Sequence, residues 1–157
     1  MKTSERGKDL IKSFEGLKYK PYKLAGESNY TVGYGHSSSQ LDPNKRYSKK
    51  EIDSFFDEDI IKFENNVNRY DKMYHWNQNE FDALVCFAYN LGSIDSLVSK
   101  GQRTRDEIAY FWRKYCKDSR GVTLEGLLAR REAERNLFLT PVDSGIIDDE
   151  IISIKGR

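Results

Sequence analysis

The chain has 157 residues, the size of one ordinary domain, and is long enough to form a hydrophobic core without disulfides or metals. Its 26 basic and 25 acidic side chains leave a formal charge of +1, so it lacks the cationic excess typical of nucleic-acid-binding proteins. Aromatic residues make up 13% of the sequence, which argues against disorder, and no apolar run approaches the ~20 residues that span a bilayer. We therefore expect a soluble protein that binds no nucleic acid and inserts into no membrane.

Capping residues and apolar spacing predict a series of helices. The first begins at a Ser4 cap and ends at Gly16. The second begins at the capping box Ser48-Lys49-Lys50-Glu51, and its apolar residues recur at helical spacing. These residues are Ile52, Phe56, Ile60, Phe63 and Val67. Further helices are expected over residues 77–92, 93–100, 104–115 and 123–140, with Thr123 as the cap of the last and Leu124 on its inner face.

Residues 17–47 differ from the rest of the chain. The segments 17–20 and 30–34 are rich in aromatic and β-branched residues, and Gly26-Glu27-Ser28-Asn29 between them has the composition of a turn. This pattern predicts a small antiparallel sheet. The fold class is therefore α+β, with one helix, a β-hairpin region, and a long helix that leads into a mainly helical part.

Two features are candidates for chemistry. Glu15 lies at the C-terminal end of the first helix, where the helix dipole disfavours a carboxylate and so favours the protonated form that a general acid needs. The alternative is a solvated glutamate at a helix end. The second feature is Gly33-Tyr34-Gly35-His36, where two glycines allow a ligand to approach the backbone or simply form a bulge or turn.

Three blocks of sequence together resemble the phage-type lysozymes, the endolysins of glycoside hydrolase family 24. The first is Glu15-Gly16-Leu17, followed by Tyr22 and then Thr31-Val32-Gly33-Tyr34-Gly35-His36. The second spans residues 79–92, which look like the family's buried central helix, and the third spans residues 126–138 with its Arg-Arg-x-x-Glu-Arg pattern. The resemblance covers about residues 4–139. It implies a lysozyme-like fold with the active-site cleft between a small β-containing lobe and a helical lobe.

The resemblance also implies an activity and a set of site residues. Family members cleave the β-1,4 bond between N-acetylmuramic acid and N-acetylglucosamine in peptidoglycan. Glu15 matches the general acid, and Thr31 matches a threonine that holds a water or the sugar. Candidate substrate-binding residues, each with packing in the sheet as the alternative, are Tyr22, Tyr30, Gly33, Tyr34 and His36. For His36 we expect that it braces the lobe, and for Arg130 and Arg131 that they form ion pairs in the helical lobe.

One departure from the family pattern concerns the second carboxylate. Leu24 stands where the family has an aspartate, two residues after the tyrosine matched by Tyr22. Glycoside hydrolysis normally uses two carboxyl groups, so we expect Glu27, the carboxylate in this loop, to serve as the second. If Glu27 lies elsewhere, Glu15 alone would support a lytic transglycosylase reaction, or the fold would only bind peptidoglycan.

The remaining expectations concern organisation and surroundings. We expect one catalytic domain over residues 1–140, with the β-containing lobe at about 15–50 and the helical lobe at about 50–140, and a tail over 141–157. Cys86 and Cys116 are predicted to be free, buried thiols, and no spacing of cysteines or histidines indicates a metal or other cofactor. We expect a monomer that lacks a signal peptide, accumulates in the cytoplasm, and reaches the wall after a holin permeabilises the membrane.

Overall fold

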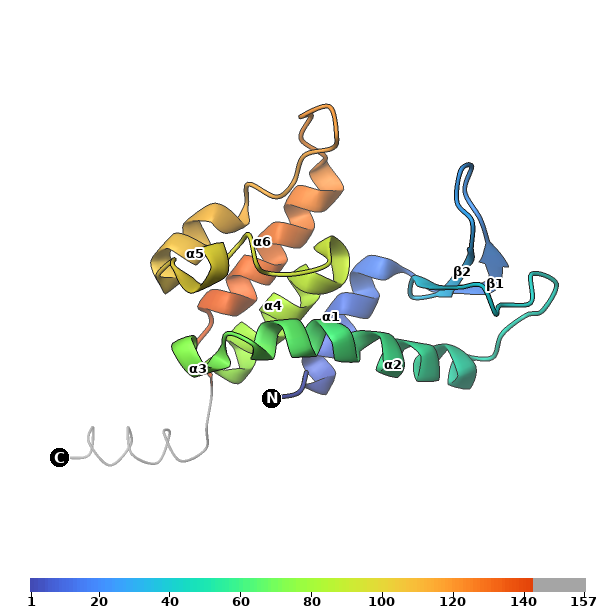
Figure 1. The fold of residues 1–157 in the computed structure, drawn as a ribbon, viewed down its shortest axis with the longest axis horizontal. Coiled ribbons are helices and arrows are strands. Elements are labelled where there is room, and N and C mark those ends of the chain that lie inside the picture. The colour runs from blue at the N-terminus through green and yellow to red at the C-terminus, as the bar shows by residue number, and fades with distance from the viewer. Residues whose placement is uncertain (143–157) are drawn as a thin grey trace, which may run out of the picture.

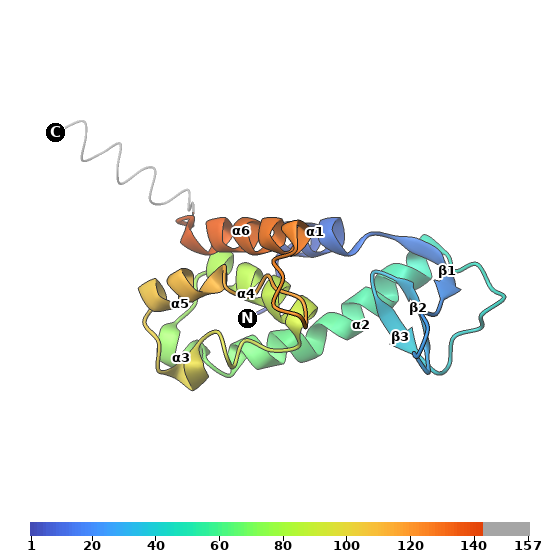
Figure 2. The ribbon, with the colours of Figure 1, turned by 90° about the horizontal axis from the view of Figure 1, so that it is seen from above.

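The computed structural model describes residues 1–142 and confirms the α+β class (Figure 1). A small sheet lies at one end of the molecule and a group of helices at the other, with α2 running between them (Figure 2). No helix within residues 1–142 is long and apolar enough to cross a membrane. The elements are α1 (Glu5–Glu15), β1 (Lys18–Tyr22), β2 (Tyr30–Gly33), β3 (His36–Ser38), α2 (Lys49–Asn68), α3 (Asp71–Tyr74), α4 (Gln78–Leu91), the 3₁₀ helix η1 (Ser99–Gly101), α5 (Arg105–Trp112) and α6 (Glu125–Leu139).

Local capping fixes where most of the helices begin. Ser4 accepts a hydrogen bond from the Gly7 amide at the start of α1. Complete capping boxes, in which the cap side chain and a glutamate three residues later satisfy each other's amides, open three further helices. They are Ser48 with Glu51 at α2, Asn77 with Glu80 at α4, and Thr104 with Glu107 at α5. The predicted helix starts are confirmed at all four places.

One predicted helix and one predicted helix cap are wrong. Residues 93–100 do not form a helix, because Ser99 and Lys100 adopt positive φ and the Lys100 amide bonds back to the Asp95 carbonyl, leaving only the short η1. Thr123 does not cap α6, because it pairs with Lys117 as an isolated β-bridge. The cap position is taken by Leu124, whose side chain makes no cap bond and is 40% exposed instead of facing inward.

The sheet is antiparallel, in the order β1-β2-β3. Lys18 pairs with Gly33 and Tyr22 with Thr31 across β1 and β2, with an irregularity between these pairs. Val32 pairs with His36 across β2 and β3, and its side chain is fully buried. The sequence missed β3, which has only three residues and, apart from His36, consists of serine, a residue with no strand preference.

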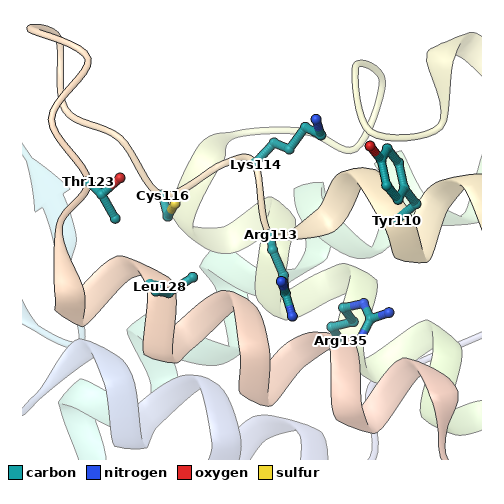
Figure 3. Close-up of a pocket in the computed structure, with 7 residues that line it drawn as sticks. All are labelled: Tyr110, Arg113, Lys114, Cys116, Thr123, Leu128 and Arg135. Carbon is teal, nitrogen blue, oxygen red and sulfur yellow. The ribbon is translucent and has the colours of Figure 1, made fainter.

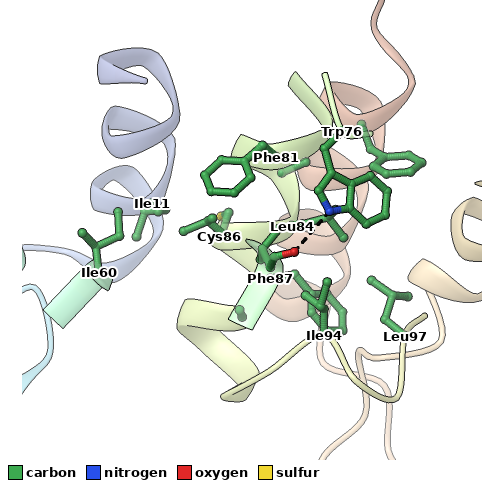
Figure 4. Close-up of a cluster of buried hydrophobic side chains, with 14 of the residues drawn as sticks. Ile11, Ile60, Trp76, Phe81, Leu84, Cys86, Phe87, Ile94 and Leu97 are labelled. Carbon is green, nitrogen blue, oxygen red and sulfur yellow. Dashed lines mark hydrogen bonds between the residues drawn. The ribbon is translucent and has the colours of Figure 1, made fainter. Parts of the chain in front are cut away.

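The core is built around α4, as the resemblance implied for residues 79–92. This helix is packed against α1, α2 and α6, and every side chain from Asn79 to Ala88 is buried. Apolar side chains from several elements meet around it (Figure 4). The Trp76 indole N–H donates to the Val67 carbonyl at 3.2 Å, which satisfies a buried polar group. Cys86 and Cys116 are free and buried, as predicted.

The N-terminal helix is held by α4. Buried Asp82 accepts a hydrogen bond from the Ser4 amide at 2.9 Å and another from the Ser4 hydroxyl. Gly7 lies against this carboxylate so closely that a Cβ at residue 7 would be 2.5 Å from the Asp82 Cγ. The α1 helix therefore belongs with the helical part of the molecule, although it precedes the sheet in the chain.

Candidate active site

Glu15 is the last residue of α1, at the junction between the helices and the sheet. Gly16, with φ of 70°, ends the helix, and its amide donates to the Lys12 carbonyl at 3.2 Å. A positive φ is favourable for glycine, so the chain can turn directly from the helix into β1. The Glu15 side chain is 18% exposed, so it retains access to a ligand.

A buried cation holds the Glu15 carboxylate. The Arg130 guanidinium of α6 forms an ion pair with Glu15 Oε2. Other nitrogens of Arg130 donate to Glu134 Oε2 at 3.2 Å and to the Cys86 carbonyl at 3.0 Å. Arg131 pairs with the same Glu134. The expected ion pairs of Arg130 and Arg131 in the helical part are thus present, but Arg130 also reaches the candidate acid, which the sequence did not indicate.

The turn between β2 and β3 faces Glu15. Gly35 has φ of 92°, and a Cβ at this position would lie 3.4 Å from Glu15 Oε1. Gly33 serves packing instead, since a Cβ there would be 2.7 Å from the Ile52 Cγ2 of α2. The two glycines are therefore needed for different contacts. Gly35 lets the turn approach Glu15, and Gly33 lets the sheet approach α2.

His36 is paired with an acid of α2. Its Nδ1 lies 2.9 Å from Asp59 Oδ2 and 3.1 Å from Asp59 Oδ1, and its ring stacks on Phe55 with the centroids 4.2 Å apart. These contacts join β3 to α2. They favour the bracing role expected for His36.

A cavity of about 170 Å³ contains Glu15 and brings together residues from both parts of the molecule. Its lining residues are Glu15, Gly35, Ser37, Asp59, Lys62, Phe63 and Tyr89. The Tyr89 hydroxyl of α4 donates to the Tyr34 carbonyl at 2.6 Å and so ties the helices to the β2–β3 turn. Burial, and then the charges of Asp59 and Glu15, raise the pKa of Tyr89, so the phenol keeps its proton and remains a donor.

The structure places Glu27 outside this set of residues. Glu27 is exposed in the turn after β1, where its amide donates to the Leu24 carbonyl at 3.1 Å. Its carboxylate folds back and accepts from the Leu24 amide at 3.3 Å. Thr31 is half-buried in β2 opposite Ser37, which lines the cavity, but Thr31 is not itself among the lining residues.

The candidate tyrosines fall into two groups. Tyr34 is buried, with its ring edge-on to Phe56 at 5.7 Å, a position that favours packing. Tyr22 is exposed on β1, and Tyr30 is half-buried under the Lys23 ammonium, whose Nζ lies 5.0 Å from the ring centroid. The rings of Tyr22 and Tyr30 are therefore accessible to a ligand.

The sequence missed the site residues that come from the long helices. Asp59, Lys62 and Phe63 lie along one side of α2, and Tyr89 lies in α4 within the segment 79–92 that the sequence assigned to the core. The i, i+4 spacing of Asp59 and Phe63 at the edge of the apolar stripe was a signal that an acid faces the same side as the core. Within residues 1–142, no cluster of three or more His, Cys, Asp or Glu side chains could hold a metal ion.

Comparison with known proteins identifies the family. The two-part arrangement is the lysozyme-like fold: the muramidase domain of SpmX from Asticaccaulis excentricus superposes with a TM-score of 0.75 and 30% identity, over 89% of this chain and 99% of that one. A family model described as phage lysozyme matches residues 12–134. The chain belongs to the phage lysozyme family.

Two curated relatives are endolysins of phages. The endolysin of Bacillus phage PZA is 39% identical over 148 residues, which make up 88% of this chain and 55% of that protein. The endolysin of Lactococcus phage c2 is 39% identical over 153 residues, 92% of this chain and 63% of that protein. The chain thus spans between half and two thirds of the length of these relatives.

Proposed function

We propose that this protein is a peptidoglycan hydrolase that cleaves the β-1,4 bond between N-acetylmuramic acid and N-acetylglucosamine, with Glu15 as the general acid. The observation that carries the proposal is the placement of Glu15, a partly exposed carboxyl group fixed by buried Arg130 and facing the Gly35 turn in a cavity at the junction of the sheet and the helices. Family membership supports the same activity.

In the proposed reaction Glu15 gives its proton to the glycosidic oxygen, and the sugar on the other side of that bond leaves with the protonated oxygen. The carboxylate formed on Glu15 is then paired with the Arg130 guanidinium, which Glu134 and the Cys86 carbonyl hold in place. An ionic hydrogen bond of this kind is stronger than a neutral one, so Arg130 stabilises the state that follows proton transfer.

A second group must deliver oxygen to the anomeric carbon. We infer that Glu27 activates a water molecule, with Thr31 helping to hold it, and that Tyr22 and Tyr30 bind sugar rings. This role requires Glu27 to leave its hydrogen bond to the Leu24 amide and turn toward Glu15.

One observation favours a second candidate reaction. The Glu27 carboxylate is occupied in its own turn and lies outside the cavity, which is lined by two acids, Glu15 and Asp59. Since Asp59 is paired with His36, Glu15 is the acid most directly placed for chemistry. In a lytic transglycosylase, Glu15 protonates the leaving oxygen as its bond to the anomeric carbon of the muramic acid breaks. The 6-hydroxyl of the same sugar attacks that carbon, and the hydroxyl proton passes to the Glu15 carboxylate. The product is a 1,6-anhydro sugar, and no water is added.

The test is digestion of purified peptidoglycan, with the products identified by mass spectrometry. Wild type is compared with Glu15→Gln, Glu27→Gln and the control Glu125→Gln, a change at an exposed glutamate at the start of α6. Hydrolysis with Glu27 as second carboxylate gives reducing-end products that are lost in both site variants and kept in the control. Anhydro products that persist in Glu27→Gln establish the transglycosylase instead. If wild type gives no product on several wall types, the result favours a protein that binds the wall without cleaving it.

The monomeric state and the release through a membrane permeabilised by a holin stay predictions. Light scattering of the purified protein checks the first. Fractionation of expressing cells, with and without a co-expressed holin, checks the second.

A further inference from the structure

A second cavity lies between α5, α6 and the loop that joins them, and shares no lining residue with the cavity at Glu15 (Figure 3). Its volume is about 500 Å³, larger than the cavity at Glu15. Three of its lining side chains are cationic and none is acidic. The lining residues are Tyr110, Arg113, Lys114, Cys116, Thr123, Leu128 and Arg135, and we call this the α5–α6 groove.

The cations of the α5–α6 groove have no acidic partners within the part of the chain that the structure describes. Among residues 1–142, no carboxylate forms an ion pair with Arg113, Lys114 or Arg135. What distinguishes these three cations is that they line one hollow together, with no acidic side chain among the lining residues. Three like charges around one hollow repel each other, and an anion in the hollow would remove that repulsion.

Two of the three cations are held in place. Arg135 Nε donates to the Ala109 carbonyl at 2.7 Å, which fixes the plane of the guanidinium while its terminal nitrogens make no other hydrogen bond with the described residues. The Lys114 ammonium lies 5.0 Å from the centroid of the Tyr110 ring and 5.5 Å from that of Phe111. Donors that are already oriented lose less entropy when they bind an anion.

The groove is separate from the Glu15 site. On α6, Leu128 and Arg135 are seven residues apart and so share a face, whereas Arg130 is turned away from Leu128 by about 200°. Arg130 points to Glu15 and the α4 backbone. A ligand in the α5–α6 groove therefore does not compete with one at Glu15.

We propose that the α5–α6 groove binds a polyanion with repeating phosphodiesters, of the kind that is attached to bacterial walls. The choice of a wall polymer rests on the proposed function, which brings the protein to the wall. A ligand with a single carboxylate would need only one arginine, because one planar guanidinium can bind both carboxylate oxygens. The three cations along the groove match a polymer whose negative charges recur along its length. A nucleic acid is the rival ligand, but the groove exposes one aromatic side chain, Tyr110, and not the row of rings on which successive bases stack.

The binding experiment uses the protein with Glu15 intact as the parent, because none of the three probes contains the bond that the proposed function cleaves. The probes are poly(glycerol phosphate), a single-stranded oligonucleotide with the same number of phosphates, and poly-glutamate. Calorimetry at 50 mM and 200 mM salt compares the parent with Arg113→Gln/Lys114→Gln. The matched control is Lys50→Gln/Lys72→Gln, which removes two charges at exposed positions with no ion pair among the described residues.

Poly(glycerol phosphate) should bind the parent and the control equally, about tenfold more weakly to the groove variant, and more weakly at the higher salt concentration. Equal affinity of the groove and control variants overturns the proposal, as does a lack of binding to the parent. Tighter binding of the oligonucleotide identifies the groove as a nucleic-acid site, and tighter binding of poly-glutamate identifies it as a carboxylate site. Digestion of phosphate-free peptidoglycan by the protein with Glu15 intact tests the proposed function separately.

Discussion

Replacing Gly7 by alanine tests how α1, and with it Glu15, is held against α4. Alanine normally stabilises a helix relative to glycine by about 1 kcal/mol. Here the new Cβ would lie 2.5 Å from the Asp82 Cγ and 2.8 Å from both the Asp82 Cβ and Oδ1. Since carbon atoms pack best at about 3.5–4.0 Å, the helix or the carboxylate must move by about 1 Å.

Asp82 is poorly able to move. Its carboxylate accepts hydrogen bonds from the Ser4 amide, the Ser4 hydroxyl and Gln78 Nε2, and the side chain is buried. Overpacking costs about 1–3 kcal/mol, and each hydrogen bond to a charged group contributes about 1.5–3 kcal/mol. If the shift breaks one of these bonds, the net loss of unfolding free energy is about 1.5–5 kcal/mol after the gain from alanine is subtracted.

The assay is urea unfolding together with thermal denaturation, where each kcal/mol corresponds to about 2–4 °C in a chain of this size. Gly126→Ala is the control, because Gly126 lies in α6 with no atom within 4 Å of the added Cβ. That variant should be as stable as wild type or slightly more stable. A Gly7→Ala protein at least as stable as Gly126→Ala would refute the reasoning.

Three further predictions concern the site and its supports. Gly35→Ala should lower the rate of peptidoglycan clearing, because the added Cβ would lie in contact with Glu15 Oε1 at 3.4 Å and take up space beside the proposed acid. Gly121→Ala, with a similar positive φ but nothing nearby, should cost a similar ~1–2 kcal/mol of stability and leave the rate unchanged. Equal rates for the two variants would contradict this. Arg130→Met should lower the free energy of unfolding in urea by about 3–5 kcal/mol, because Glu15 and buried Glu134 lose this partner. Arg120→Met is the control and should lower it by less than about 1 kcal/mol, because the Arg120 side chain in its ion pair with Asp118 is 77% exposed. Hydrogen bonds from the Tyr70 hydroxyl at 2.7 Å, and then from the Asn66 amide, lower the pKa of Asp95. The Asp95 carboxylate therefore stabilises the fold at pH values above its unfolded pKa of about 3.9. This contribution is lost as the pH falls through the folded pKa. Urea midpoints at pH 6, 4 and 3 should therefore fall less steeply for Asp95→Asn than for wild type, and parallel pH curves would show that Asp95 does not supply this dependence.

Features set by local sequence were predictable. The capping boxes at Ser48, Asn77 and Thr104 involve residues three apart, and all three open the expected helices. Local patterns failed where a local competitor was present. Residues 93–100 had helical composition, but the positive φ of Ser99 and Lys100 prevents a continuous helix, and the bridge to Lys117 draws Thr123 away from the start of α6.

The contacts within the site were not predictable from spacing. Glu15 and the Gly35 turn were indicated by family resemblance, but their partners come from distant parts of the chain. His36 pairs with Asp59 across 23 residues, Tyr89 reaches Tyr34 across 55, and Arg130 reaches Glu15 across 115. No periodicity in one sequence encodes such pairs, since each is decided by how whole helices pack.

The helix α1 is synthesised before the helices that pack against it. This order determines when the site at Glu15 can be completed. Glu15 is made early. Asp82, which anchors α1 through Ser4, is made 78 residues after Ser4. Arg130, which pairs with Glu15, is made 115 residues after it. A nascent chain therefore carries its acid long before that acid has a fixed position, and contacts this far apart in sequence form slowly. Because α6 is the last helix among the described residues, the site is completed only as synthesis of this part of the chain ends. Partial chains released from the ribosome should consequently lack the completed site, so the proposed cleavage of peptidoglycan would not arise on unfinished protein.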